Sequence, residues 1–182
     1  MIDIARHAGV GKGTLYEHFE GKEDLFTTLV LAVMREALEA LAAGTLADEP
    51  ERALARTIDY LVATALEENL DLYRLFFDFW GVSAAYRKKS RDPLRECAAA
   101  FRDLVAEILR KGQRAGRFRA DLDPDAFARA LLASVEGLSL PMVILGEAVD
   151  LPAHAATLRA LFLGAAVTGA PLYGASLLRE KR

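Results

Sequence analysis

The residues best suited to chemistry lie close to the start of the sequence, in the stretch AGVGKGTLYEHF at positions 8–19. A glycine-rich run that contains a lysine and a threonine could form a loop that binds phosphate groups, as in nucleotide-using enzymes. The same run could instead form a tight turn that leads into a short helix. The two interpretations predict different classes of protein, so the surrounding residues must decide between them.

A nucleotide-binding loop requires more than this stretch provides. The Walker motif consists of Gly, four further residues, and Gly-Lys-Ser/Thr, and it follows a buried strand. If Gly11 and Lys12 are the Gly-Lys pair, Arg6 replaces the first glycine and Gly13 replaces the Ser or Thr. The preceding residues 1–8, MIDIARHA, carry charges and have helical apolar spacing, and no βαβ pattern follows. The sequence therefore argues against a nucleotide-using enzyme.

A helix-turn-helix accounts for the same residues. Gly9 can adopt the left-handed conformation that ends a helix, Val10 and Gly11 form the turn, and a second short helix runs over about 12–18. In this motif the second helix enters the major groove of DNA. The apolar residues expected between the two helices are Ile4, Ala5, Ala8, Val10, Leu15 and Phe19, and those expected to face outward are Lys12, Thr14, Tyr16 and His18.

The longer stretch DIARHAGVGKGTLYEHFEGKEDLF resembles the signature I-A-x-x-A-G-V-[SG]-x-G-T-[LI]-Y-x-[HY]-F-x-x-K-x-x-L of the tetracycline-repressor (TetR) family of bacterial transcriptional regulators. The resemblance implies a cytoplasmic, homodimeric, ligand-responsive regulator that is not an enzyme, most often a repressor on a pseudo-palindromic DNA operator. It also implies that a small, largely apolar effector releases the DNA. The DNA-binding residues that it implies are Gly11, Lys12, Thr14, Tyr16, His18 and Lys22.

Two features depart from the family pattern. The family normally begins with a further helix, whereas Met1 already lies within the second family helix, so we expect a preceding segment to be missing from this chain. Consistently, positions 1–26 hold only three Lys/Arg against five Asp/Glu. Gly11 also replaces a serine that is frequent in the family. These departures leave a second interpretation open, a helical small-molecule binding module or enzyme with a vestigial DNA-binding segment.

Composition predicts an all-α chain. Among its 182 residues, 53% are hydrophobic and 27% are charged, as in a globular protein, and alanine and leucine are far commoner than isoleucine and threonine. One cysteine, Cys97, allows no internal disulfide, and the three histidines lack metal-ligand spacing, so we expect neither metal nor cofactor. Residues 160–178 are uncharged but rich in Gly and Ala, which favours a helix buried against a partner over a membrane span.

Helix boundaries can be expected at several points. Asp92-Pro93 and Asp123-Pro124 each predict a helix start, Gly116 predicts a helix end, and Pro141 predicts a kink or an end. Apolar residues recur at helical spacing over about 22–43, 50–68, 70–80, 93–115, from 124 onward and 153–169. We expect a DNA-binding domain with its connecting helix over 1–43 and a ligand-binding and dimerisation domain over 44–182.

Two further sites are implied by the family resemblance. A pocket between the middle helices would be lined by Leu61, Phe76, Trp80, Phe101 and Val105, with Tyr60, Asp78 and Glu136 as polar anchors. The aromatic residues around 73–80 could equally form core. The last two helices would form a four-helix interface with a second subunit through Phe127, Leu131, Val135, Leu138, Leu158, Leu161, Phe162, Ala165 and Ala166.

Overall fold

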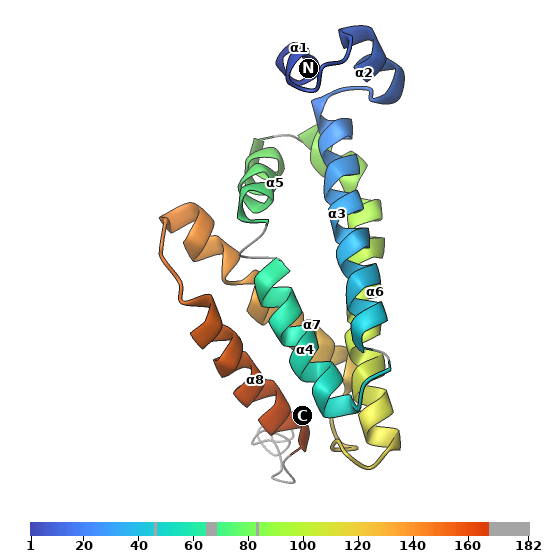
Figure 1. Ribbon diagram of the computed structural model, residues 1–182, viewed down its shortest axis with the longest axis vertical. Coiled ribbons are helices and arrows are strands. Elements are labelled where there is room, and N and C mark those ends of the chain that lie inside the picture. Colours follow the sequence, from blue (N-terminus) through green and yellow to red (C-terminus); the bar gives the residue numbers. More distant parts are fainter. Residues whose placement is uncertain (46, 65–68, 83, 168–182) are drawn as a thin grey trace, which may run out of the picture.

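The computed structural model describes residues 1–45, 47–64, 69–82 and 84–167, and within these ranges it contains helices and no strand. The all-α prediction is therefore confirmed. Figure 1 shows a small N-terminal unit carried on one end of a long helix, whose remaining length borders a body formed by the other helices. The elements are α1 (Ile2–His7), α2 (Lys12–His18), α3 (Lys22–Thr45), α4 (Pro50–Val62), α5 (Leu70–Val82), α6 (Ala84–Arg114), α7 (Pro124–Glu136), the π-helix η2 (Pro141–Leu145) and α8 (Leu151–Val167).

The turn between α1 and α2 forms as the sequence predicts. Gly9 has a φ of 68°, a left-handed conformation that glycine adopts without steric cost. The Val10 amide donates to the Ala5 carbonyl at 3.0 Å, and the Gly9 amide donates to the Arg6 carbonyl at 3.3 Å. These bonds satisfy carbonyl groups at the end of α1 and reverse the chain, so α2 crosses α1 as a helix-turn-helix requires.

The apolar contact within this unit is smaller than we expected. Ala5 is buried and Leu15 is 9% exposed, whereas Ile4 and Val10 are 38% and 41% exposed and Ala8 is also exposed. The prediction that all of them pack between the helices was therefore wrong. Helices of six and seven residues touch only near their crossing point, so few side chains can be buried there.

The main core lies in the helical body, where α6 packs against α3, α4 and α7, and α4 packs against α8. Its most buried large side chains are Leu54, Ile58, Val105, Ile108, Leu109 and Leu131. Ion pairs join the helices at the surface of this core. Arg117 contacts Glu51 at 2.7 Å and Arg110 contacts Asp125 at 3.0 Å.

The start of α6 differs from our expectation. We predicted a helix beginning at Asp92-Pro93, but α6 begins at Ala84 and contains Pro93 in its interior. Proline removes one backbone hydrogen bond and can be accommodated within a long helix. Asp92 pairs with Arg95 at 3.1 Å instead of capping a helix. The parallel prediction at Asp123 is confirmed, because its carboxylate accepts hydrogen bonds from the amides of residues 125 and 126 at 2.8 and 2.9 Å.

Helix α7 ends at Glu136, and η2 begins at Pro141, where we predicted a kink or an end. The stretch Pro124–Leu145 is 22 residues long, has a mean hydropathy of 1.5, and meets the length and composition of a membrane span with 28% of its apolar window buried. Core helices meet the same criterion. Phe127, Ala128, Leu131 and Val135 point into the main core, so the apolar character of α7 is that of a core helix with one uncovered face.

Candidate nucleic-acid interface

Helix α2 holds four of the six residues that we predicted to bind DNA, and one buried side chain sets its orientation. Leu15 faces the protein, and every other residue of Lys12–His18 is exposed. At 100° per residue, Lys12 and Tyr16 lie on one flank of the helix, and Thr14 and His18 lie on the other. The anchoring of Leu15 therefore turns two different polar surfaces toward solvent.

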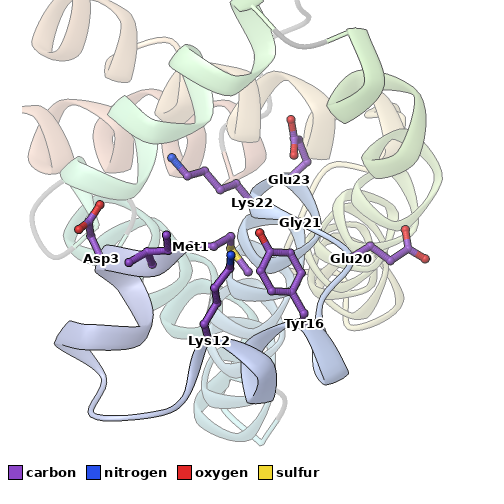
Figure 2. A pocket seen from close by; sticks show the side chains of 9 residues that line it. Met1, Asp3, Lys12, Tyr16, Glu20, Gly21, Lys22 and Glu23 are labelled. Atoms are coloured by element: carbon purple, nitrogen blue, oxygen red, sulfur yellow. The ribbon is translucent and has the colours of Figure 1, made fainter.

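The first flank faces the start of α3 across an open hollow of about 480 Å³. Figure 2 shows the Lys12 and Tyr16 side chains and the side chain of Lys22, from the first residue of α3, around this space. The Lys12 Nζ atom lies 5.6 Å from the centre of the Tyr16 ring, which is a cation–π distance. The hollow is lined by Met1, Ile2, Asp3, Lys12, Tyr16, Glu20, Gly21, Lys22 and Glu23.

The two lysines at this hollow are available to an anion. Within the described parts of the chain, neither Lys12 nor Lys22 lies within ion-pair distance of a carboxylate. By contrast, Arg6 on α1 is paired with Asp3 at 3.4 Å, although both side chains are exposed. Two unpaired ammonium groups beside a phenol provide charge and hydrogen-bond donors of the kind that bind phosphate oxygens.

The remaining predicted residues do not line this hollow. Gly11 is the N-cap of α2, with extended backbone angles (φ −67°, ψ 145°) and no side-chain cap. His18 stands beside Phe19, with ring centres 6.4 Å apart and an edge-on arrangement. The structure therefore brings Lys12, Tyr16 and Lys22 together and places Thr14 and His18 on the opposite flank of α2.

The predicted effector residues are divided between the core and the surface. Leu61, Phe101 and Val105 are buried in the main core, and Tyr60 is partly buried against it. Asp78 and Glu136 are exposed, and the side chains of Phe76 and Trp80 lie outside the described part of the structure. A second hollow of about 230 Å³ lies between α4 and α8, beside the Asp59–Arg159 ion pair, and none of the predicted effector residues lines it.

Tyr73 on α5 is a polar residue that our pocket prediction missed. Burial, together with the nearby negative charge of Glu136, raises the pKa of its phenol to about 12. Protein packed on one side of Glu136 also raises the pKa of that carboxyl group, although its side chain is open to solvent on the other side. The phenol of Tyr73 and the carboxylate of Glu136 therefore lie near enough to interact electrostatically, a proximity that sequence spacing alone does not reveal.

The predicted subunit interface contains both buried and exposed residues. Phe127, Leu131, Val135, Leu158 and Ala166 are buried within the subunit, where Phe127 packs edge-on against Phe162 at 5.3 Å. These residues stabilise the subunit itself. The apolar side chains left uncovered on the same elements include Leu161, which is 61% exposed, and three that we had not predicted, Leu140, Ile144 and Leu145.

Charged clusters suited to a metal do not occur among the described residues, where no group of three or more His, Cys, Asp or Glu side chains converges. Cys97 is buried and burial raises the pKa of its thiol, so it lacks the reactivity of an exposed nucleophile. The surface around α2 that carries Lys12, Tyr16 and Lys22 is thus the strongest candidate site that the geometry provides.

Comparison with known proteins identifies the family of the chain. The family model "Bacterial regulatory proteins, tetR family" matches residues 1–29, and the model "BetI-type transcriptional repressor, C-terminal" matches residues 50–163. The HTH-type transcriptional repressor DhaR of Mycobacterium sp. (strain GP1) is 31% identical over 147 residues, which cover 78% of this chain and 71% of DhaR. The HTH-type transcriptional regulator TtgR of Pseudomonas putida is 26% identical over 159 residues, which cover 83% of this chain and 73% of TtgR.

Solved structures share the fold at lower sequence identity. FadR from Bacillus subtilis, a transcriptional regulator solved in complex with stearoyl-CoA, superposes with a TM-score of 0.73 at 21% identity, covering 89% of this chain and 86% of FadR. The regulatory protein TetR from Rhodobacter sphaeroides gives a TM-score of 0.69 at 23% identity, covering 91% of this chain and 86% of that protein.

Proposed function

The chain belongs to the TetR family of bacterial transcriptional regulators, and from this premise we propose that its α1–α2 unit binds a DNA operator and represses transcription. The observation that carries the proposal is the surface around α2. Lys12, Tyr16 and Lys22 surround one hollow, and Leu15 anchors α2 so that its other side chains face outward. The lysines bind phosphates on the edges of the major groove, and α2 lies within the groove.

The regulator acts as a homodimer, with the interface on α7, η2 and α8. Leu140, Ile144 and Leu145 are 53%, 56% and 66% exposed, and Leu161 is 61% exposed on the neighbouring helix. A second copy of the chain would cover this apolar surface together with the partly buried Leu138, Phe162 and Ala165 of our original prediction. A twofold dimer presents two copies of α2, so the operator is pseudo-palindromic.

A small, largely apolar effector regulates this binding from within the helical body. The predicted lining combines the apolar side chains of Leu61, Phe101 and Val105 with the polar groups of Tyr60 and Glu136, a composition typical of small-molecule sites. The effector shifts the protein between two conformations only as far as its affinities for them differ. We infer that the chain is a regulator without enzymatic activity and that it works in the cytoplasm, beside its DNA.

The test is a mobility-shift titration of the natural chain on the promoter region next to its own gene. We expect a salt-dependent complex on that DNA and much weaker binding to a scrambled duplex of the same length and composition. Equal affinities for the two duplexes would refute a sequence-selective regulator. That result would favour the second interpretation, a helical binding module whose DNA-binding segment is vestigial.

A further inference from the structure

Gly13 and Glu17 form the outermost ridge of α2. They lie two residues before and two residues after Leu15, the side chain that α2 turns toward the protein. Two residues correspond to about 200° around a helix axis, so both positions face away from Leu15. Because they are four residues apart, they also lie one above the other on the same line. This ridge therefore meets the groove first when α2 approaches DNA.

The protein itself gives no reason for a glycine at position 13. Its φ is not in the left-handed region, unlike that of Gly9, so the backbone does not demand glycine. A Cβ atom added there would meet no atom within 4 Å beyond its chain neighbours and the nearby backbone of its own helix, so packing does not demand glycine either. Glycine is a poorer helix former than every residue except proline. The space above Gly13 is therefore open to a partner outside the described part of the chain.

Contacts within the described part of the chain do not explain Glu17 either. Its side chain is exposed, and it has no ion pair or side-chain hydrogen bond in the part of the chain that the structure describes. A carboxylate on a surface that approaches DNA is repelled by the phosphates. On the floor of the major groove, however, a carboxylate can accept a hydrogen bond from the N4 amino group of cytosine. Adenine also presents an amino group there, but its neighbouring N7 acceptor repels a carboxylate, so cytosine is the favoured partner.

We propose that this ridge reads the operator sequence: the main chain at Gly13 makes the closest approach to a base-pair edge, and the Glu17 carboxylate accepts a hydrogen bond from a cytosine amino group. The inference rests on the DNA-binding function proposed above. It requires one C·G pair at a fixed position in each half-site. It also gives Glu17 a role in selectivity, separate from the affinity that Lys12 and Lys22 provide through phosphates.

The decisive experiment measures affinities of the wild-type chain and of Glu17→Ala for the operator and for all its single base-pair variants at one salt concentration. We expect the wild type to prefer C·G at one position of each half-site by roughly 10-fold. Glu17→Ala should lose that preference while binding scrambled DNA more tightly, because a negative charge is gone. Glu39→Ala, which removes the same charge from the exposed side of α3, should leave the preference unchanged.

If Glu17→Ala changed the affinity for all DNA sequences by the same factor, the assignment of Glu17 would be overturned, since the loss of a merely solvated carboxylate has that effect. Gly13→Ala tests the close approach separately. We expect roughly 10-fold weaker operator binding with a thermal midpoint equal to or above that of the wild type. Unchanged affinity, or a lowered midpoint, would overturn the role of Gly13. A wild-type chain without any sequence preference would instead refute the proposed function.

Discussion

Removing the charge of Lys22 should change the salt dependence of DNA binding by a calculable amount. Lys22 is exposed at the first residue of α3 and borders the hollow beside α2. Each phosphate that a cation neutralises contributes about −0.9 to the slope of log affinity against log salt. A homodimer carries two copies of the residue, so Lys22→Ala should make the slope shallower by about 1.8.

The same arithmetic gives an observable difference in affinity. Between 50 and 200 mM salt, the wild type should lose about 12-fold more affinity than Lys22→Ala, which corresponds to a fourfold salt change raised to the power 1.8. Fluorescence anisotropy with a labelled operator at five or six salt concentrations measures both slopes. The variant should also weaken binding to all sequences by a similar factor, because a phosphate contact carries no sequence information.

Arg52→Ala is the matched control for this experiment. Arg52 is exposed near the start of α4 and carries the same charge, but the length of α3, about 36 Å, separates it from Lys22. For Arg52→Ala, the slope of log affinity against log salt should equal that of the wild type. If Lys22→Ala and Arg52→Ala gave the same slope as the wild type, Lys22 would not contact a phosphate, and the proposed orientation of α2 and α3 on DNA would be wrong.

Three further substitutions test the rest of the structure. Leu161→Arg places a charge on the exposed apolar face of α8 and should yield a monomer by analytical ultracentrifugation; a variant that remained dimeric would exclude this face. Gly112→Ala adds a Cβ that would overlap the ring of Phe118 and should lower the free energy of unfolding by about 1–3 kcal/mol in urea titrations, whereas Gly13→Ala, where the space is open, should not. The pKa of Glu136 is raised in the folded state, so ionisation of this carboxyl group lowers the stability of the fold as the pH rises above the ordinary carboxyl range. Glu136→Gln should therefore raise the midpoint of thermal unfolding at pH 7 and lose that advantage near pH 4. An equal gain at both pH values would contradict the raised pKa of Glu136.

Local signals in the sequence predicted the helix-turn-helix and the Asp123 cap correctly. The left-handed Gly9 and the Asp123 cap each depend on hydrogen bonds between residues within five positions of each other. Such features are encoded where they occur, and the residue types alone identify them. The start of α6 could not be predicted in this way. Whether Pro93 begins a helix or lies within one depends on the residues before it and on the packing of the whole helix.

The candidate sites in the body show a second limit of sequence reasoning. Periodicity identifies an apolar face but not what that face touches. Val135 and Leu161 follow equally good helical patterns, yet Val135 is 2% exposed within the subunit and Leu161 is 61% exposed. Likewise, Tyr73 and Glu136 are 63 positions apart in the sequence, and only the fold places the phenol near the carboxylate.

The position of α3 provides a physical route by which a ligand in the body would control contacts at α2. Phe26 and Val30, near the α2 end of α3, form a small separate core with Leu72 of α5 and Leu94 of α6. The other end of α3 is held in the main core through Leu41. With α3 about 36 Å long, a tilt of about 5° around its Leu41 end displaces α2 by roughly 3 Å. That is close to one base-pair step, so in a dimer an opposite displacement of each α2 takes both recognition helices out of register with their half-sites. We therefore expect a modest movement of α5 or α6 against Phe26 and Val30 to release the operator without unfolding of the DNA-binding unit.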